Sequence, residues 1–371
     1  MAVSEYADVR KALTRSCAAV GVPVSGIFEL TPRCNLQCKM CYVRLTPDQM
    51  RPIGRELSAA QWIALAEDAK AAGTVFLLIT GGEPTLRSDF AEIYEQLANM
   101  GFSIAINTNA TLLTEELRTL WHRFPPAQVN VTLYGVCRED YQALCGDASA
   151  FDRVVDGLRW LKEQGILIHL NTTMVPQNLH SWHGLECFAR DMGLELRMTT
   201  YCFPPVRREN CSCHSFSRLE PEVAAELIVK DIVFREGIET AQTIAKDLNV
   251  PPKTDCGLEI GEPMQCLAGR AQFWMTWNGT MTACGMLDYP CADPLEQGFI
   301  AAWEQIKAQT AAIRLCPECV GCSIRHSCMN CAAVTYTETR SFQGKPEYMC
   351  QLNRNYRKLM QELLESSHDM P

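Results

Sequence analysis

Two groups of closely spaced cysteines are the residues of this chain best suited to chemistry. Cys34, Cys38 and Cys41 fall within eight residues, and five further cysteines occur in residues 316–331. The 371-residue chain has 20 cysteines and no apolar export signal at its N-terminus. Because the cytosol keeps thiols reduced, we interpret both groups as metal or iron–sulfur ligands rather than disulfides. Four isolated cysteines are interpreted as small apolar core residues: Cys17, Cys137, Cys145 and Cys187.

The first group has the spacing C-x3-C-x2-C and directly follows an expected strand. Three thiolates can hold three irons of a 4Fe–4S cube, and no fourth cysteine is nearby, so one iron stays open to a ligand that is not protein. A zinc site whose fourth ligand lies elsewhere is the alternative interpretation of this spacing. An open iron is useful for chemistry, whereas a structural site gains by being closed.

A second motif, Thr80-Gly81-Gly82-Glu83-Pro84, ends the next expected strand. The two glycines allow the backbone to approach a ligand closely, and Glu83 offers an acceptor for an ammonium group. Alone, the pattern is equally typical of a tight turn with a helix-capping acid. Its position one strand after the three cysteines predicts that both motifs lie at the same end of the sheet.

Seven spaced cysteines of the C-terminal third are more than a single cluster can use. They are Cys266, Cys284, Cys319, Cys322, Cys328, Cys331 and Cys350. A two-residue type I′ turn is predicted at Asn278-Gly279, and the hairpin would bring Cys284 back toward Cys266. The five-residue gap between Cys322 and Cys328 fits a zinc ribbon poorly, because such ribbons separate their cysteine pairs by a dozen residues or more.

Short apolar runs alternate with helical segments through the first 200 residues. The expected strands are Val24–Leu30, Val75–Thr80, Phe102–Asn107, Val129–Tyr134, Ile166–Thr173 and Leu194–Thr200. The expected helices are Ser58–Ala72, Ser88–Met100, Phe151–Gln164, Glu220–Glu236, residues 298–313 and Gln351–Ser366. Ser58 and Ser88 are the expected N-caps of the first two. This alternation predicts an α/β fold, a partial (β/α)6 barrel of the TIM type with its site at the C-terminal ends of the strands.

The pattern changes after residue 200, and four segments are expected. They are an N-terminal segment 1–23, the barrel 24–204, a bridging region 205–262 in which residues 237–265 show no clear period, and a cysteine-rich domain 263–371 with a terminal helix. The net charge of −9 argues against a general nucleic-acid or anionic-membrane partner. No run of 18 apolar residues is present, so we expect a cytoplasmic protein.

The three-cysteine loop followed by Gly-Gly-Glu-Pro resembles the radical S-adenosylmethionine (SAM) enzymes over roughly residues 24–200. The resemblance implies a 4Fe–4S cluster on Cys34, Cys38 and Cys41 whose open iron chelates the amino and carboxylate groups of SAM. One electron from the cluster then cleaves SAM and releases a 5′-deoxyadenosyl radical, while the protein orients the cofactors and excludes water.

The same resemblance implies which residues contact SAM. They are Tyr42, Gly81, Gly82, Glu83, Asn107, Asn109 and Thr132. The Gly-Gly-Glu segment would hold the methionine amino group, and the residues at later strand ends would reach the ribose and carboxylate. After the fourth strand this chain has Tyr134 where many relatives, including the sulfatase-maturing enzymes, have an acid.

The C-terminal cysteines resemble the SPASM extension of radical SAM enzymes, which binds two auxiliary 4Fe–4S clusters. By that resemblance one cluster has the ligands Cys319, Cys322, Cys328 and Cys350, and the other has Cys266, Cys284 and Cys331. The family usually has three residues between its last two clustered cysteines, and this chain has two. The fourth ligand of the second set stays open: Gln272 occupies the usual cysteine position, and Cys256, Cys291, Cys316 or an open iron are the alternatives.

These features predict an oxygen-sensitive radical SAM/SPASM enzyme of oxidoreductase type that abstracts a hydrogen atom from a peptide or protein. The expected reaction modifies a ribosomally made precursor peptide (a RiPP) by a thioether, a carbon–carbon crosslink or epimerisation. Only 33 residues precede Cys34, so a separate leader-recognition protein is expected, unless the peptide binds directly in the barrel. A flavodoxin- or ferredoxin-type electron donor is also expected. No residue beyond the cluster ligands is assigned a catalytic role.

Two other interpretations are kept. Within the enzymes, the alternative is an anaerobic sulfatase-type maturase or a small-molecule radical SAM enzyme. In another class altogether, the chain would be a non-catalytic zinc-binding interaction protein, against which the intact first motif and the Gly-Gly-Glu-Pro segment argue.

Overall fold

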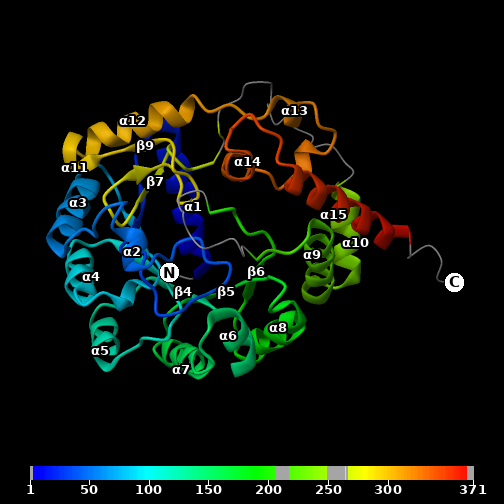
Figure 1. Ribbon diagram of the computed structural model, residues 1–371, viewed down its shortest axis with the longest axis horizontal. Coiled ribbons are helices and arrows are strands. Elements are labelled where there is room, and N and C mark those ends of the chain that lie inside the picture. Colours follow the sequence, from blue (N-terminus) through cyan, green and yellow to red (C-terminus); the bar gives the residue numbers. More distant parts are fainter. Residues whose placement is uncertain (1–2, 206–216, 249–263, 265, 366–371) are drawn as a thin grey trace.

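The computed structural model describes residues 3–205, 217–248, 264 and 266–365 (Figure 1). Within them one nine-stranded sheet has the order β6-β5-β4-β3-β2-β1-β7-β8-β9. The strands from β6 to β7 pair in parallel, whereas β7, β8 and β9 pair antiparallel. The strands are β1 (Ser25–Glu29), β2 (Phe76–Thr80), β3 (Ser103–Thr108), β4 (Gln128–Thr132), β5 (Ile168–Thr173), β6 (Leu196–Thr199), β7 (Gln272–Met275), β8 (Met281–Thr282) and β9 (Cys291–Ala292).

Helices follow one another around the outside of the sheet (Figure 1). Those of the first half are α1 (Val3–Val20), α2 (Pro47–Met50), α3 (Ala59–Ala71), α4 (Phe90–Asn99), α5 (Glu115–Arg123), α6 (Arg138–Cys145), α7 (Ala150–Glu163) and α8 (Trp182–Asp191). Those of the second half are α9 (Pro221–Glu236), α10 (Ile238–Leu248), α11 (Pro294–Gln297), α12 (Phe299–Ala311), α13 (Pro317–Val320), α14 (Ala332–Thr339) and α15 (Glu347–Glu365). The predicted incomplete (β/α)6 barrel is confirmed, since each of the six expected strands overlaps one of β1–β6.

The two faces of the barrel strands differ in polarity. Along β3, β4 and β5, alternate residues such as Ile106, Val131 and Leu170 are fully buried in the core. The residues between them, such as Asn107 and Asn130, are only half-buried. Because successive side chains of a strand point to opposite faces, the apolar set packs under the helices and the polar set lines the inside of the barrel.

Local signals explain where the helices near the site begin. Ser58 caps α3 as predicted: its hydroxyl accepts from the Gln61 backbone N–H at 3.3 Å, and the Gln61 side chain returns to the Ser58 N–H at 3.0 Å. The predicted cap at Ser88 is wrong, because α4 starts one residue later with Asp89 in the cap position. The Asp89 carboxylate accepts hydrogen bonds from Arg87 at 2.8 and 2.7 Å instead of capping the helix.

The predicted two-residue type I′ turn at Asn278-Gly279 is also wrong. Thr276 donates its backbone N–H to the Thr280 carbonyl at 2.9 Å, which leaves a three-residue loop. Gly279 has φ +93°, whereas a type I′ turn needs positive φ at both central residues, and Asn278 is not among the residues with positive φ. The strand before this loop, β7, pairs with β1 and so continues the barrel sheet beyond its first strand.

The C-terminal helix α15 packs against α9 and α10, which connect it to the barrel (Figure 1). Ala225 of α9, Ala245 of α10, and Tyr356 and Met360 of α15 form a second buried apolar cluster. Residues 237–265 are expected from the sequence to form a bridge with no clear period, but their first part is the helix α10, which packs two buried alanines against its neighbours. Residues 249–263 and 265 lie outside the described residues. At the N-terminal ends of β1, β2 and β7, α1 packs Cys17 and Ala18 against Val24, Phe76 and Ala271.

Among the described residues, no helix combines the length and the apolar character needed to cross a bilayer.

A carboxyl pair joins α8 of the barrel to α9. Glu186 of α8 is 6% exposed, and its neighbour Asp231 of α9 is partly buried. Burial, followed by the neighbouring Asp231 carboxyl, raises the pKa of Glu186 to about 7. Burial also raises the pKa of Asp231. The pair therefore holds a proton at a pH where the unfolded chain has lost it.

We predict that this pair makes the folded state less stable as pH rises from about 4.5 to about 7. The folded pKa of Glu186 lies above its unfolded value, so the folded chain binds more protons across this window and its free energy of unfolding falls. The free energy of unfolding should fall by about 1–3 kcal/mol less between pH 5 and pH 7 in Glu186→Gln than in the unsubstituted protein, as measured by urea unfolding at both pH values. Glu226→Gln on the exposed face of α9 is the control, and an identical pH dependence for both variants would contradict the prediction.

Candidate functional site

The three N-terminal cysteines lie in the loop that follows β1. Cys34, Cys38 and Cys41 are each partly buried, and the sulfurs of Cys41 and Cys38 are close enough to act electrostatically on Cys34. Burial, opposed by a hydrogen bond from the Leu36 backbone, raises the pKa of Cys34 to about 12. Three thiols crowded in this way are costly to ionise together, and bound metal cations reverse that cost.

Nitrogen donors already point at these sulfurs. The Cys34 sulfur accepts from the Leu36 backbone N–H at 3.4 Å and from the Asn109 side-chain amide at 3.8 Å. The Cys41 sulfur accepts from the Arg44 backbone N–H at 3.3 Å. Such donors stabilise thiolates, so the donor set of this loop fits the iron–sulfur cluster predicted for it.

The Gly-Gly-Glu segment docks on the cysteine loop. Gly82 donates its N–H to the Thr31 carbonyl at 2.7 Å, and Glu83 donates to the Arg33 carbonyl at 2.8 Å. A Cβ added at Gly81 would collide with the Thr31 carbonyl, and one at Gly82 with the Arg33 carbonyl. The structure shows that these glycines admit the neighbouring backbone of the same chain, and their contact with a ligand stays a prediction.

Glu83 lies at the centre of the strand ends and is completely buried. One carboxylate oxygen accepts from the Thr85 N–H at 3.1 Å, the Thr85 hydroxyl at 2.6 Å and the Thr108 hydroxyl at 2.8 Å. The other accepts from the Asn109 N–H at 2.7 Å. Burial raises the pKa of this carboxyl, and the hydrogen bonds oppose that shift. Glu83 thus ties the end of β2 to the end of β3, and its contact with the SAM amino group stays a prediction.

The other residues predicted to bind SAM occupy two levels of the barrel. Asn109 also hydrogen-bonds to Asn35 at 2.9 Å, so it belongs to the cysteine loop. Asn107 lies inside the barrel, where it donates to Thr80 at 3.3 Å and accepts from Asn130 at 2.7 Å. The two further predicted residues are both partly exposed: Thr132 at the end of β4 and Tyr42 directly after Cys41.

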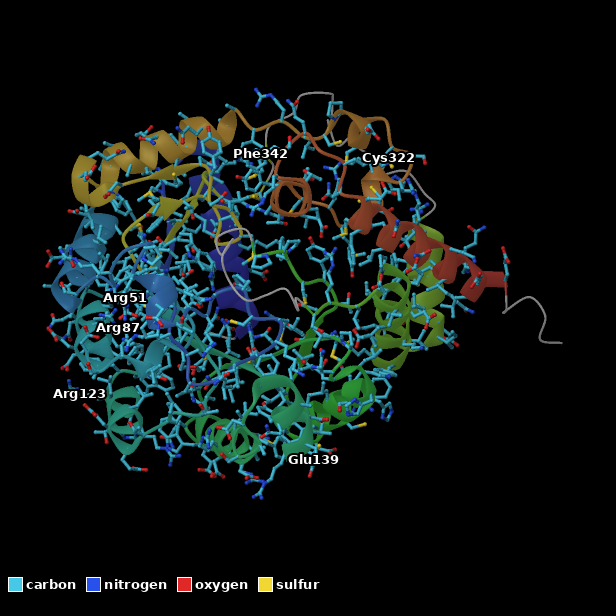
Figure 2. The ribbon with its side chains drawn as sticks, in the orientation of Figure 1. Arg51, Arg87, Arg123, Glu139, Cys322 and Phe342 are labelled. Carbon is cyan, nitrogen blue, oxygen red and sulfur yellow. The ribbon has the colours of Figure 1, made fainter. Side chains whose placement is uncertain are left out.

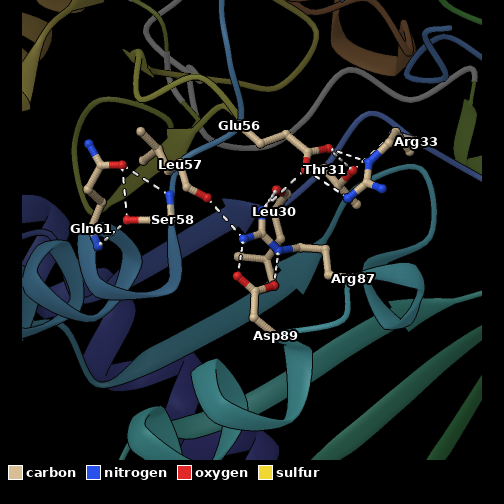
Figure 3. A network of polar contacts seen from close by, with 9 residues as sticks. All are labelled: Leu30, Thr31, Arg33, Glu56, Leu57, Ser58, Gln61, Arg87 and Asp89. Carbon is tan, nitrogen blue, oxygen red and sulfur yellow. Dashed lines mark hydrogen bonds and ion pairs between the residues drawn. The ribbon is translucent and has the colours of Figure 1, made fainter. Parts of the chain in front are cut away.

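An ionic network that the sequence analysis missed supports this loop (Figure 3). The Arg87 side chain is 4% exposed and donates at 2.9 Å to the carbonyls of both Leu30 and Leu57. It also pairs with Asp89, and although burial alone would raise the pKa of Asp89, the guanidinium holds it below its usual range. One guanidinium therefore joins the end of β1 to the segments before α3 and α4.

The same network reaches the residue that precedes the first cysteine (Figure 3). Glu56 accepts from the Arg33 guanidinium through two hydrogen bonds of 2.8 Å, from the Thr31 hydroxyl, and lies 3.7 Å from Arg87. The hydrogen bond with Glu56 raises the pKa of Arg33. The signal in the sequence was Arg87 two residues before Asp89, but the other partners of Arg87, which are Leu30, Glu56 and Leu57, lie 30 or more residues away in the chain.

We predict that Arg87→Met lowers the free energy of unfolding by about 3–5 kcal/mol, because it leaves the partly buried Asp89 carboxylate and two buried carbonyls unpaired. Arg51→Met is the matched control, since Arg51 pairs with Asp48 where both side chains are about four-fifths exposed (Figure 2). That exposed pair should contribute about 0–1 kcal/mol. Anaerobic urea unfolding measures both variants, and equal losses would show that burial does not decide the role of Arg87.

Four of the seven C-terminal cysteines line one pocket beside α15. They are Cys319, Cys322, Cys328 and Cys350. Arg325 and Arg354 line the same pocket, and the buried Nε of Arg325 has no hydrogen-bond partner. Burial raises the pKa of Cys328, and the nearby charge of Arg325 opposes that rise without cancelling it. Four thiols and two guanidinium groups fit a negatively charged bound group. An iron–sulfur cluster with four thiolate ligands is such a group.

The remaining predicted ligands are less closely grouped. Cys266 is exposed and within electrostatic range of Cys331, while Cys284 is partly buried against the core. Of the alternatives for a fourth ligand, Cys316 is buried and its carbonyl accepts from the backbone N–H of Cys319 at 3.0 Å, and Cys291 is exposed on β9. Cys256 lies outside the described residues. Within the described ranges, no three His, Cys, Asp or Glu side chains are arranged to share a single metal ion.

Comparison with known proteins identifies the class. Residues 28–185 match the Radical SAM superfamily. The AdoMet-dependent heme synthase of Nitratidesulfovibrio vulgaris is 23% identical over 322 residues, which are 83% of this chain and 87% of that protein. The PqqA peptide cyclase of Bradyrhizobium diazoefficiens is 28% identical over 160 residues, 43% of this chain and 41% of that protein. The chain therefore contains a radical SAM domain over residues 28–185, and its enzymatic relatives identify it as an enzyme.

Solved structures agree in fold. Streptococcus suis SuiB bound to its precursor peptide SuiA has a TM-score of 0.65 at 16% identity, covering 93% of this chain and 80% of SuiB. The family implies a 4Fe–4S cluster and SAM as cofactors, and the three-cysteine loop described above is where the residues fit them. The position of this loop at the C-terminal ends of parallel strands is the usual place for a site in such barrels.

Proposed function

We propose that this enzyme reductively cleaves SAM and uses the resulting radical to abstract a hydrogen atom from a peptide or protein. The observation that carries the proposal is the docking of the three-cysteine loop on the Gly-Gly-Glu segment at the open end of the barrel. A 4Fe–4S cluster held by Cys34, Cys38 and Cys41 would supply the electron that splits SAM into methionine and a 5′-deoxyadenosyl radical.

The chain's own residues would bind and orient the cofactor. The Gly81-Gly82-Glu83 backbone and the end of β3 bring Asn109 to the cysteine loop, and Tyr42 borders the same loop. Thr132 and Asn107 would face the ribose and carboxylate from inside the barrel. The polar inner face of β3 and β4 supplies the hydrogen bonds that such a ligand requires.

We further propose that residues 263–371 form a SPASM-type region after a barrel of residues 24–204, with residues 1–23 and 205–262 as the N-terminal and bridging segments. The pocket beside α15 supports one auxiliary cluster on Cys319, Cys322, Cys328 and Cys350. The proposal of a second rests on Cys266, Cys284 and Cys331, of which the first and third are within electrostatic range. Auxiliary clusters could accept the electron that remains on the substrate after hydrogen abstraction.

The substrate proposal is a ribosomally made peptide, modified by a thioether, carbon–carbon crosslink or epimerisation. It is supported by the fold shared with SuiB, which binds the peptide SuiA, and by the sequence match to a peptide cyclase. A flavodoxin- or ferredoxin-type donor and a separate leader-recognition protein are proposed partners in the cytoplasm.

A tetrapyrrole is the second candidate substrate. The heme synthase similarity extends over 83% of this chain, whereas the peptide cyclase similarity covers 43% of it. That broader coverage is the observation that favours a small-molecule substrate of the porphyrin class.

We predict distinct losses from the two proposed cluster sites. Replacing Cys34, Cys38 and Cys41 by alanine should abolish 5′-deoxyadenosine formation and leave about eight of about twelve irons bound. Cys328→Ala should lose about four irons and product but retain some 5′-deoxyadenosine formation. Iron and sulfide analysis with anaerobic turnover measures both. If the triple variant still cleaves SAM, or if the protein holds stoichiometric zinc, the proposed function is wrong.

The substrate is tested by turnover of the reconstituted enzyme with SAM and a reductant. We expect a short peptide encoded beside this gene to lose mass or gain a crosslink, seen by mass spectrometry, in parallel with 5′-deoxyadenosine. Iron-coproporphyrin III is the matched alternative substrate, and a cysteine-bearing sulfatase peptide is the third. Conversion of the porphyrin alone would replace the peptide proposal by the tetrapyrrole one.

A further inference from the structure

The middle of the cysteine loop is held by α6, a helix that the sequence analysis did not connect with it. Gln37 donates its backbone N–H to the Cys145 carbonyl at 2.9 Å, and Lys39 donates to the Leu144 carbonyl at 3.1 Å. Both carbonyls lie at the C-terminal end of α6, where the hydrogen-bond pattern of a helix leaves carbonyls without a partner. The loop therefore caps the helix, and the helix fixes the backbone on both sides of Cys38.

The other contacts described above hold the loop before this point. The turn after β2 binds its backbone at Thr31 and Arg33, and Asn109 binds the Asn35 side chain at 2.9 Å. The next stretch of the loop, which carries Cys38, is the part that α6 holds. A shift of α6 would therefore move this proposed iron ligand relative to the part of the loop that is fixed on the strand ends.

Because α6 is short, its position depends on contacts with the rest of the chain. It has eight residues, and a helix of that length is marginal on its own. Tyr141 and Leu144 are fully buried and pack the helix into the core of the barrel. Burial of apolar surface has no preferred direction, whereas hydrogen bonds do, so the hydrogen bonds of α6 decide its position along its own axis.

The first turn of α6 is fixed by Asp140, which is 3% exposed. Its carboxylate accepts from the Val136 N–H at 2.9 Å and from the Ser181 hydroxyl at 2.8 Å, and it lies 2.9 Å from Nε2 of His180. Although burial alone would raise the pKa of Asp140, the hydrogen bonds hold it below its usual range. The carboxylate is therefore ionised and only accepts, so Nε2 of His180 is the donor.

These contacts join α6 to two barrel strands. Val136 lies in the segment after β4, and His180 and Ser181 lie in the 3-10 turn after β5. A Cβ added at Gly135 would collide with the Cβ of Asp140, so the segment after β4 packs directly on the helix at this point. One buried carboxylate thus connects the mouth of the barrel to the helix that caps the cysteine loop.

Ser, His and Asp are also the residues of a hydrolytic triad, but they do not form one here. In a triad the histidine lies between the serine and the acid. In this chain Ser181 and His180 both bind the same carboxylate, and the Ser181 hydroxyl proton is already donated to Asp140. The arrangement holds segments together rather than activating a nucleophile.

Groups behind the ligands of a metal site support metal binding, because they keep the ligands in place. We propose that Asp140 is a positioning residue of the cysteine loop: it fixes α6, and α6 holds the backbone around Cys38 in the conformation that retains a cluster. The inference rests on the proposed function, because it requires that the loop hold a cluster. It gives a role in cofactor retention to a carboxylate that need not touch the cluster, SAM or substrate.

The test is retention of iron by the full, reconstituted and reduced chain in competition with EDTA, followed by electron paramagnetic resonance. The signal that changes when SAM is added reports the cluster of this loop. In Asp140→Ala, the EDTA concentration that removes half of this signal should be about tenfold lower than in the wild type. The remaining iron, about eight atoms, should be retained as in the wild type.

Two further variants separate positioning from general stability. In Asp140→Asn the amide oxygen can still accept from Val136 and Ser181, which share one carboxylate oxygen, so most of the retention should return. His180→Leu removes one of the three contacts through a side chain that is 69% exposed, so the variant should fold and show a smaller loss than Asp140→Ala.

Asp293→Ala is the matched control. The Asp293 carboxylate accepts from the Leu295 N–H at 2.9 Å and from the Glu296 N–H at 3.2 Å at the start of α11, in the C-terminal half. It therefore also fixes the start of a helix, but one that does not cap the cysteine loop. Its loss should leave retention of the SAM-responsive cluster unchanged.

Equal retention of the SAM-responsive cluster in the wild type and in Asp140→Ala would overturn the inference and leave the proposed function standing. Release of all clusters together in Asp140→Ala would also overturn it, because the acid would then support the fold as a whole. Should that variant not fold, His180→Leu decides, and retention equal to the wild type would contradict the inference. If the wild-type protein shows no signal that responds to SAM, the proposed function itself fails, and this inference fails with it.

Discussion

The structure of the site depends on the close approach of two backbones, the loop after β1 and the turn after β2. Two hydrogen bonds, from Gly82 to Thr31 and from Glu83 to Arg33, continue the pairing of β1 with β2 beyond the strands themselves. Only glycine fits at positions 81 and 82, because any side chain there would force the two backbones apart. Once this contact forms, the cysteine loop, the buried Glu83 and the end of β3 are all held at one edge of the sheet.

Charges around this contact are arranged so that no buried one is left alone. Arg87 is matched by Asp89 and Glu56, and Glu56 in turn binds Arg33 at the entrance to the cysteine loop. Removing one partner from such a network is costly, since the remaining charge is then buried without compensation. The network therefore stabilises the loop in one conformation, which is what a site with three metal ligands on a single loop requires.

The C-terminal half is attached to the barrel at both ends. The strand β7 extends the barrel sheet next to β1, and α15 returns to pack on α9 and α10. The cysteine pocket lies between these two attachments, beside α15 on the side of the molecule where Figure 2 labels Cys322. The pocket cysteines and the N-terminal cysteines are far apart in the chain. The sheet and the long helix α15, which are both rigid elements, connect the two regions.

By itself the sequence determined the type of fold. It also indicated the cysteines that we propose as iron–sulfur ligands. Strand periodicity, the Ser58 cap and the spacing of Cys34, Cys38 and Cys41 are local patterns, and each depends on residues only a few positions apart. Only the tertiary structure decided which side chains support those ligands. Arg87 and the C-terminal end of α6 reach the cysteine loop because parallel strands bring their C-terminal ends to one edge. Contacts between residues about a hundred positions apart leave no periodic trace in the chain, since they depend on the order of strands and not on the spacing within any one segment.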